Sequence, residues 1–237
     1  MDSSSRPWKQ GKTKDLFLTE DPQVLRLCFR DAASAYGGLI RGEVPGKGSV
    51  NNRVSDHLMR YLEAEGIPTQ YLKELDERNT LVRRLDMLPL EVIVRNLAAG
   101  SLTERLGLKE GTRLGRVVLE FNYKSDELDD PLVNEYHITT MGWATAEELD
   151  IIDDVAMRVN GLLTALFDRV DIELVDFKLE FGRRPDGTLA LGNEISPDSC
   201  RLWDKRTGEK LDKDVFTLSR DMARDAYLEV ARRLLGD

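Results

Sequence analysis

Apolar and polar positions along the first part of the chain predict strands followed by a helix. Residues 11–18 leave a glycine turn and residues 24–29 alternate with a period of two, so both segments predict strands. Residues 37–48 contain five glycines and predict a mobile loop. From residue 51 to 65 the apolar positions recur on one helical face, which predicts a helix capped by one of the two asparagines at its start.

Strand and helix patterns continue through the middle of the chain. Two strands are expected at residues 81–85 and 90–94, and the interruption at residues 87–89 predicts a hinge. Ser101, with a glutamate three residues later, matches a capping box, so a short helix is expected to start there. Residues 145–168 carry the longest helical pattern, which also opens on a capping box.

The last third of the chain predicts a hairpin and a final helix. Residues 172–181 and 188–195 have strand patterns, and Pro185-Asp186-Gly187 between them is a strong hairpin signal. An amphipathic helix is expected from about residue 218 to 235. Strands precede helices in each half, which predicts an α+β fold with two lobes. The expected lobes are a β-rich one, residues 1–86, and an α+β one, residues 87–237.

The composition is that of an ordinary globular protein. Hydrophobic residues make up 41% and charged residues 32%, and the formal net charge is -9. This acidic balance argues against a broad nucleic-acid-binding surface but allows a local basic pocket for a small anion. No apolar run approaches the ~20 residues of a membrane span, and the N-terminus has no signal-peptide pattern. We therefore expect a cytoplasmic protein that binds neither nucleic acid nor membrane, with Cys28 and Cys200 as free thiols.

The predicted strand at residues 172–181 is the most informative segment. Asp176, Lys178 and Glu180 alternate with apolar residues and therefore share one face of the strand, opposite a face that begins at Val175. A solvated outer face with a few weak ion pairs would have the same pattern. The residues on the neighbouring strand decide between this explanation and a functional one.

That neighbouring strand adds oxygen ligands, although the sequence leaves its register open. A two-residue turn at Asp186-Gly187 would place Asn193 opposite Glu180, whereas a three-residue turn would bring Glu194 to the charged face instead. In either register, oxygen donors gather around Lys178. Hard oxygen ligands suit Mg²⁺, which commonly bridges to phosphate oxygens.

Other segments combine a basic side chain with a turn or a helix start, which is typical of anion binding. Asp198 and Arg201 follow the predicted hairpin, and Arg95 ends a strand shortly before Ser101. Plainer explanations are a surface ion pair for Arg201 and an ordinary helix cap for Ser101. No nucleophile-elbow motif is present, so the combination favours ATP-dependent group transfer over hydrolysis. Weaker candidates are Lys12 and Lys14 beside Gly11, and Lys47 in the glycine-rich segment.

In chain order, these motifs resemble one family, phosphoribosylaminoimidazole-succinocarboxamide synthase (SAICAR synthetase). The resemblance runs from about residue 8 to the C-terminal helix, with no large insertion. Its most specific parts are residues 94–101 and 194–204. The matching segments are Gly11-Lys12-Thr13-Lys14, residues 45–48 with 51–52, and residues 89–101, 130–135, 174–182 and 194–204.

The resemblance implies a two-lobed fold with ATP bound between the lobes, similar to kinases and ATP-grasp enzymes. It implies that Mg-ATP phosphorylates the carboxylate of carboxyaminoimidazole ribotide, and that the amine of L-aspartate then attacks the acyl phosphate to give the amide, ADP and phosphate. Phosphorylation supplies a leaving group, while Mg²⁺ and lysines offset the developing charge. The expected partners are therefore ATP, the ribotide and L-aspartate, in a homodimer.

Residue roles are carried over only to positions that match the family's motifs. The implied catalytic residues are Lys178, Asp176 and Asp198. The implied ATP-binding residues are Lys12, Lys14, Met87 through its backbone at the adenine, and Glu180. The implied Mg²⁺ ligands are Glu180 and Asn193. The implied substrate-binding residues are Arg95, Ser101 and Arg201 for the ribotide phosphate, with Lys47, and with Asn134 and Glu135 on a mobile cover.

Two positions depart from the family's pattern. Asn193 stands where the family usually has Asp, so an oxygen is kept but a charge is lost, and Mg²⁺ should bind more weakly. Ala32 stands where a second acidic residue often follows Asp31. These departures leave two alternatives open. One is a related ATP-dependent ligase or phosphotransferase that acts on a different acid, and the other is a nucleotide-binding protein without turnover.

Overall fold

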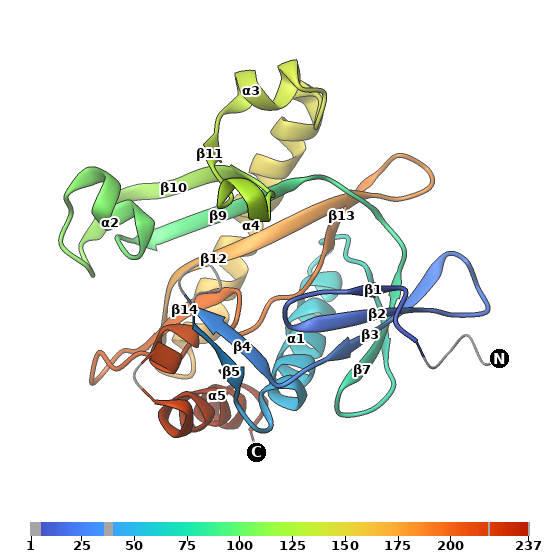
Figure 1. The fold of residues 1–237 in the computed structure, drawn as a ribbon. Coiled ribbons are helices and arrows are strands. Elements are labelled where there is room, and N and C mark those ends of the chain that lie inside the picture. Colours follow the sequence, from blue (N-terminus) through green and yellow to red (C-terminus); the bar gives the residue numbers. More distant parts are fainter. Residues whose placement is uncertain (1–5, 36–39, 218, 237) are drawn as a thin grey trace.

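An antiparallel sheet forms the N-terminal side of the molecule (Figure 1). The structure is a computed structural model that describes residues 6–35, 40–217 and 219–236. The five strands of this sheet follow the order β1-β2-β3-β7-β6, and a separate hairpin pairs β4 with β5. The strands are β1 Lys9–Gln10, β2 Lys14–Leu18, β3 Val24–Phe29, β6 Tyr71–Glu74 and β7 Asn79–Arg83, and those of the hairpin are β4 Ala32–Ala35 and β5 Ile40–Glu43.

A second sheet contains the strand that carries most of the predicted chemistry. Its path is β11-β10-β9-β12-β13, and both β14 and β8 also pair with β12. β12 therefore lies at the centre, and it runs beside β9 across the molecule (Figure 1). The strands are β8 Asp86–Met87, β9 Leu90–Leu97, β10 Arg113–Tyr123, β11 Leu132–Val133, β12 Ile172–Arg183, β13 Leu189–Gly192 and β14 Cys200–Asp204.

Helices cover the second sheet and connect it to the first. α4 packs against β12 and β9, and α1 packs against α5. In the described residues, no helix has the length and apolar character needed to span a membrane. The α-helices are α1 Lys47–Ala64, α2 Ser101–Leu106, α3 Glu135–Thr140, α4 Ala146–Asp168 and α5 Arg220–Leu235, and short 3₁₀ turns are η2 Asp126–Leu128 and η3 Lys213–Thr217.

The main hydrophobic core lies around the second sheet. Val54 and Leu58 of α1 are fully buried in the same cluster as Val94 of β9 and Phe177 of β12. The first sheet has a small cluster of its own around Leu25 and its neighbours. The predicted α+β class is confirmed, because antiparallel sheets are combined with separate helices. The division into two lobes at residue 86 stays a prediction. α1 belongs to the first of these lobes by sequence, but it packs into the core around the second sheet.

The start of α1 differs from the prediction. The helix begins at Lys47 after Gly46, which has a φ of 84° and provides no side-chain cap. The prediction that Asn51 or Asn52 caps the helix is therefore wrong, because both residues lie after its first turn, and their side chains are buried. The predicted mobile loop is wrong for its described part, which forms β5 and the first turn of α1. Residues 37–39 of that loop lie outside the described residues.

The two predicted capping boxes have different outcomes. At α4 the box is confirmed, because Thr145 Oγ1 accepts from the Glu148 amide at 3.2 Å and Glu148 Oε2 accepts from the Thr145 amide at 2.9 Å. At α2 it is wrong, because Gly100 occupies the cap position with φ 54° and ψ -139°. Ser101 is the first helical residue, and its side chain is free to bind elsewhere. Cys28 and Cys200 are free thiols, as expected.

Candidate active site

A cavity of about 670 Å³ lies between the two sheets. Both sheets contribute lining residues, and these include apolar as well as polar and charged side chains. Such a mixture of apolar walls and a few charged groups is typical of a small-molecule site. The apolar lining includes Leu16, Leu25, Leu27, Val82 and Met87, and the charged or polar lining includes Lys14, Lys124, Glu180 and Asn193.

The end of the hairpin between β12 and β13 leads into Asn193, which lines the cavity, and then into Glu194, which is buried. A three-residue turn places Glu180 opposite Gly192, with the Arg184 amide bonded to the Thr188 carbonyl at 2.8 Å. β13 ends at Gly192, and Asn193 then adopts a left-handed φ of 58°. The strand predicted to reach residue 195 is therefore shorter. The expectation that only one of the two side chains would face the charges is wrong, because the chain leaves the sheet before Asn193 and both side chains accept from Lys14.

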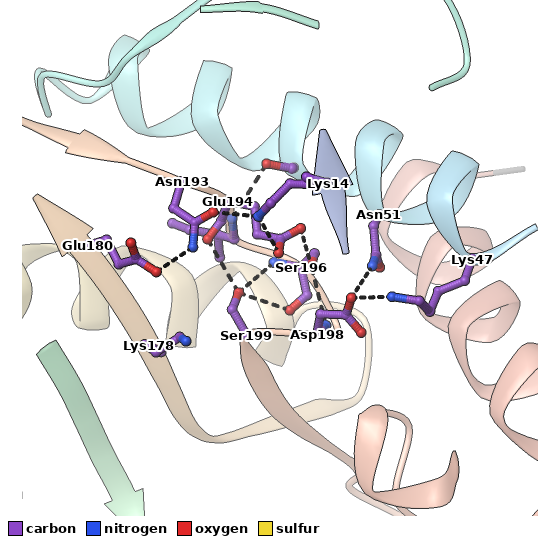
Figure 2. A network of polar contacts seen from close by, with 12 residues as sticks. Lys14, Lys47, Asn51, Lys178, Glu180, Asn193, Glu194, Ser196, Asp198 and Ser199 are labelled. Carbon is purple, nitrogen blue, oxygen red and sulfur yellow. Dashed lines mark hydrogen bonds and ion pairs between the residues drawn. The ribbon is translucent and has the colours of Figure 1, made fainter. Parts of the chain in front are cut away.

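Lys14 of β2 connects the first sheet to this hairpin end (Figure 2). Its Nζ donates to Asn193 Oδ1 and, at 2.6 Å, to Glu194 Oε1. Asn193 Nδ2 donates to Glu180 Oε1 at 2.6 Å, and Lys124 Nζ donates to the other oxygen of Glu180. Two carboxylates, one amide and two lysines therefore form a single polar network on the cavity floor.

The charged face of β12 is enclosed by protein. Asp176 and Glu180 are each 4% exposed, which excludes the solvated outer face considered from the sequence. Burial disfavours the charged carboxylate of Glu180, but the charges of Lys124 and Lys178 outweigh it and lower its pKa. Val175 lies in a small cluster with Leu97, apart from the main core, because a bulge interrupts the register between Leu174 and Asp176. The expected apolar face is therefore wrong at Val175.

Lys178 is paired with Glu91, a residue that the sequence analysis overlooked. Its Nζ donates to Glu91 Oε1 at 2.5 Å, from β12 to the adjacent strand β9. Burial acts to lower the pKa of Lys178, but the carboxylates of Glu91 and Glu180 outweigh it and raise the pKa. Lys178 is thus a cation, and its side chain is partly exposed. A glutamate inside the apolar run of β9 was the signal that could have identified Glu91.

A second polar cluster joins the predicted phosphate-binding residues. Arg95 Nη1 and Arg201 Nη1 both donate to Asp176 Oδ2 at 2.9 Å. Arg95 Nη2 also donates to Ser101 Oγ at 3.1 Å. Gly100 allows the close approach of Arg201, because a Cβ on this glycine would lie 2.6 Å from Arg201 Nη2. The structure therefore brings two arginines and the start of α2 together, as an anion site requires.

Lys47 and Asp198 form a buried pair at the junction of α1, α5 and the segment after β13. Lys47 is 1% exposed, and its Nζ donates to Asp198 Oδ2. Asn51 Nδ2 donates to the same oxygen at 2.8 Å, and Tyr227 Oη donates to Oδ1 at 2.5 Å. Burial opposes the charge of Asp198, but Lys47 outweighs it and lowers the pKa. Figure 2 shows Asp198 beside Ser196 and Ser199, so the network fixes that turn.

Lys213 is a further cation near this cluster that the sequence analysis overlooked. Burial, together with the positive charges of Lys178 and Arg201, lowers its pKa. Asp214, its neighbour in η3, accepts from Arg201 Nε at 2.9 Å. Nothing in the local sequence distinguishes Lys213 from a surface lysine, because only the fold brings η3 to the arginine cluster. Lys213 is half-buried next to Asp214, the partner of Arg201, and is therefore a candidate for contact with an anionic substrate.

The remaining predicted residues lie farther from the polar network. Lys12 Nζ donates to Asp126 at 2.7 Å, and neither is among the described residues that line the cavity, whereas Lys14 lines it and donates to Glu194. Met87 lines the cavity from β8, which pairs with β12. Asn134 caps α3 by accepting from the His137 amide at 3.1 Å, and Glu135 follows it. Neither Asn134 nor Glu135 is among the described residues that line the cavity.

The oxygen atoms on the cavity floor are suitable ligands for a hard cation. Glu180, Glu194 and the amide oxygen of Asn193 are oxygen ligands, as Mg²⁺ prefers. In the part of the chain that the structure describes, no three residues among histidine, cysteine, aspartate and glutamate form a metal-holding group. The set fits Mg²⁺ that keeps several waters and bridges to a phosphate, because such a site needs only one or two carboxylates.

Comparison with known proteins gives a consistent result. The family model for SAICAR synthetase matches residues 7–234. A phosphoribosylaminoimidazole-succinocarboxamide synthase from Exiguobacterium sibiricum is 48% identical over 232 residues, which cover 98% of this chain and 99% of the relative. Among solved structures, the synthase from Ehrlichia chaffeensis matches with a TM-score of 0.95, 39% identity and coverage of 98% of this chain and 99% of that one.

A solved SAICAR synthetase in complex with ADP also matches, with a TM-score of 0.93, 40% identity and 97% coverage of both chains. Sequence identities of 40% and 48% are high enough to show the family as well as the fold, and the matches cover nearly the whole of each chain. The predicted family and reaction class are confirmed. The chain belongs to the SAICAR synthetase family of ATP-dependent ligases of purine biosynthesis.

Proposed function

We propose that the protein joins L-aspartate to the carboxylate of carboxyaminoimidazole ribotide, using Mg-ATP and releasing ADP and phosphate. The observation that carries this proposal is the adjacency of two polar clusters on β12. Glu180 belongs to the cavity network and Asp176 to the arginine cluster, with Lys178 between them on the same strand. A phosphate donor in the cavity and an anionic substrate at the arginines would therefore meet beside Lys178.

The reaction has two steps that balance without a redox partner. A carboxylate oxygen of the ribotide attacks the γ-phosphorus of ATP, and the bond to the ADP oxygen breaks. The amine of aspartate then attacks the acyl carbon, phosphate leaves, and the nitrogen loses a proton. Positioning and charge neutralisation account for most of the catalysis in such phosphoryl transfers. The lysines of the cavity floor are suited to both tasks.

In the nucleotide cavity, Lys14 and Lys124 are the cations best suited to phosphate oxygens. Both are bonded to floor carboxylate or amide oxygens, so phosphate binding would exchange one acceptor for another. Lys12 is suited to an outer phosphate, since it is exposed and follows Gly11, which lines the cavity. Met87 on β8 is suited to the base, because it lies on the apolar side of the cavity.

Glu180 and Asn193, with Glu194, are the residues that would hold Mg²⁺. When bound, the ion supplies positive charge that offsets the charge building on the transferring phosphoryl group. Glu180 accepts from Asn193 and Lys124, so these donors keep the carboxylate oriented. An amide at residue 193 gives one negative charge fewer than the family's usual aspartate, which motivates the expectation of weaker metal binding.

On the substrate side, Arg95, Ser101 and Arg201 are suited to the ribotide phosphate, and Asp176 orients both arginines. Lys178 is suited to neutralising the acyl phosphate as it forms. Asp198 and Lys47 support the turn at residues 196–199, a positioning role. Asn134 and Glu135 stay candidates for a cover that closes on substrate. The homodimer also stays a prediction.

The direct test is ADP release by purified protein with Mg-ATP, the ribotide and L-aspartate, omitting one component at a time. Release that requires all three is the expected result. Release with another carboxylic acid in place of the ribotide would favour the alternative motivated by Asn193, a related ligase with a changed substrate. ATP binding without any ADP release would leave a nucleotide-binding protein without this reaction.

A further inference from the structure

Trp8 is a half-exposed aromatic side chain at the edge of the nucleotide cavity. It is 49% exposed and lines the cavity, although it lies outside the motifs that the proposed function uses. Its amide donates to the Leu16 carbonyl at 2.7 Å, and the next residue, Lys9, pairs with Leu16. The backbone of Trp8 is therefore fixed to the first sheet, so the position of the indole does not depend on a free terminus.

Trp8, just before β1, lies beside the part of β2 that is away from Lys14, the lysine proposed to bind phosphate. Lys14 and Leu16 are two residues apart on β2, which is about 7 Å along a strand. β1 runs antiparallel to β2, so Trp8 lies at the end of the pair farther from Lys14. Leu16, Leu25 and Val82 line the cavity on that side. A nucleotide with its phosphates at Lys14 would extend its sugar and base towards Trp8.

Arg84 holds the indole from one side. Its guanidinium carbon lies 5.0 Å from the centre of the Trp8 ring, within the range of a cation–π interaction. The Arg84 amide donates to the Gln23 carbonyl at 2.7 Å, which fixes the arginine to the segment before β3. A cation over one face of an aromatic ring leaves the opposite face to another planar group. Arg84 also lines the cavity, so both side chains border the same space.

We propose that Trp8 contacts the adenosine part of the nucleotide and covers the base end of the cavity, with Arg84 as the residue that positions the indole. The inference rests on the proposed nucleotide site. A single exposed hydrophobic residue is ordinary by itself. Trp8 differs because it borders the cavity, has a fixed backbone and carries a cation on its ring. Stacking on an aromatic side chain needs only the flat face of a base, so the contact adds affinity without replacing phosphate recognition.

The test compares binding of ADP with binding of inorganic tripolyphosphate to the full chain by calorimetry, in the presence of Mg²⁺. We expect Trp8→Ala to raise the Kd of ADP about tenfold, or about 1.4 kcal/mol, and to leave the Kd of tripolyphosphate unchanged. Trp8→Phe should recover part of the loss. Arg84→Gln should weaken ADP binding less than Trp8→Ala. Ile151→Ala is the matched control, because Ile151 is also 49% exposed but belongs to α4.

Tryptophan emission gives a second readout. The chain has three tryptophans, so Trp8→Phe leaves Trp143 and Trp203 as internal references. ADP should change the emission of the unsubstituted protein, and Trp8→Phe should abolish that change. Unchanged ADP affinity in Trp8→Ala, or an equal loss for ADP and tripolyphosphate, would overturn the inference while leaving the nucleotide site intact. Failure of the unsubstituted protein to bind ADP would overturn the proposed function itself.

Discussion

Lys14 and Asn193 join the two sheets through a hydrogen bond from Nζ to the side-chain oxygen. The nitrogen of the same amide group, Asn193 Nδ2, donates to Glu180 Oε1 at 2.6 Å. An aspartate cannot make this second contact, because a carboxylate has no hydrogen to donate. Asn193 therefore links Lys14 to Glu180 through the two ends of one amide group. The single substitution Asn193→Asp would remove this link and add a negative charge.

Asn193→Asp is expected to lower the Mg²⁺ concentration that gives the half-maximal rate. The new carboxylate would add a charged oxygen ligand next to Glu180, and hard cations favour such ligands. Without Mg²⁺ the two carboxylates would repel each other, so the melting temperature in a chelator should fall and recover on adding Mg²⁺. Magnesium titrations of rate and of thermal melting check both effects. An unchanged or higher magnesium requirement would remove Asn193 from the metal site.

Lys178→Ala is expected to reduce kcat by about 10² to 10³, the usual range for loss of one preorganised electrostatic contact. The fold should persist, although Glu91 loses its partner at 2.5 Å and stability should drop by about 1–3 kcal/mol. Rate assays and chemical denaturation are the measurements. Glu91→Gln is the control, because it removes the partner charge and keeps Lys178. A rate loss no larger than the loss of folded protein would make Lys178 a structural residue.

Gly100→Ala is expected to weaken binding of the ribotide and to destabilise the fold by about 1–3 kcal/mol, because φ 54° and ψ -139° strain any residue with a Cβ. The added carbon would also lie 2.6 Å from Arg201 Nη2 and displace that guanidinium. Gly115→Ala serves as the control, since a Cβ there meets nothing within 4 Å. The KM for the ribotide and the unfolding midpoint report the two effects. Equal behaviour of the two variants would contradict this role for Gly100.

Asp212 is expected to make the fold less stable as the pH rises from about 4 to 7. Burial, with the nearby charge of Asp214, raises the pKa of Asp212 to about 7, whereas an unfolded aspartate titrates near 3.9. Between these values the folded protein binds the extra proton, so stability decreases with rising pH in this window. Asp212→Asn should remove this component. The free energy of unfolding of both proteins is measured from pH 4 to 8. The difference between them should change with pH mainly below pH 7. A difference that does not vary with pH would contradict the raised pKa of Asp212.

Periodicity predicted the elements that depend on local pattern. β3, α4 with its capping box, and the hairpin of β12 and β13 follow from alternation, helical spacing and turn residues. The start of α1 could not be predicted in this way, because Gly46 occupies the cap position before Lys47 and provides no side-chain cap. Its asparagines serve tertiary contacts instead. The prediction from capping preference was wrong because Asn51 and Asn52 bond to distant segments instead.

The candidate site shows the same limit. Asp176, Lys178 and Glu180 were predicted to share a face, because strand geometry fixes alternation. Their partners come from distant segments, so the pairing of Lys178 with Glu91 and the approach of Lys213 needed the fold. The position of Asn193 depended on where β13 ends and on a left-handed backbone, neither of which a strand pattern specifies.

The central claim is that ATP phosphorylates the ribotide carboxylate before aspartate attacks. Ribotide labelled with ¹⁸O in that carboxylate tests it most directly, with mass spectrometry of the inorganic phosphate released in the complete reaction. An acyl phosphate intermediate predicts that one labelled oxygen appears in phosphate for each amide formed, because the oxygen that carries the phosphoryl group leaves with it. Amide formation with unlabelled phosphate would contradict an acyl phosphate and would require a different route for the energy of ATP.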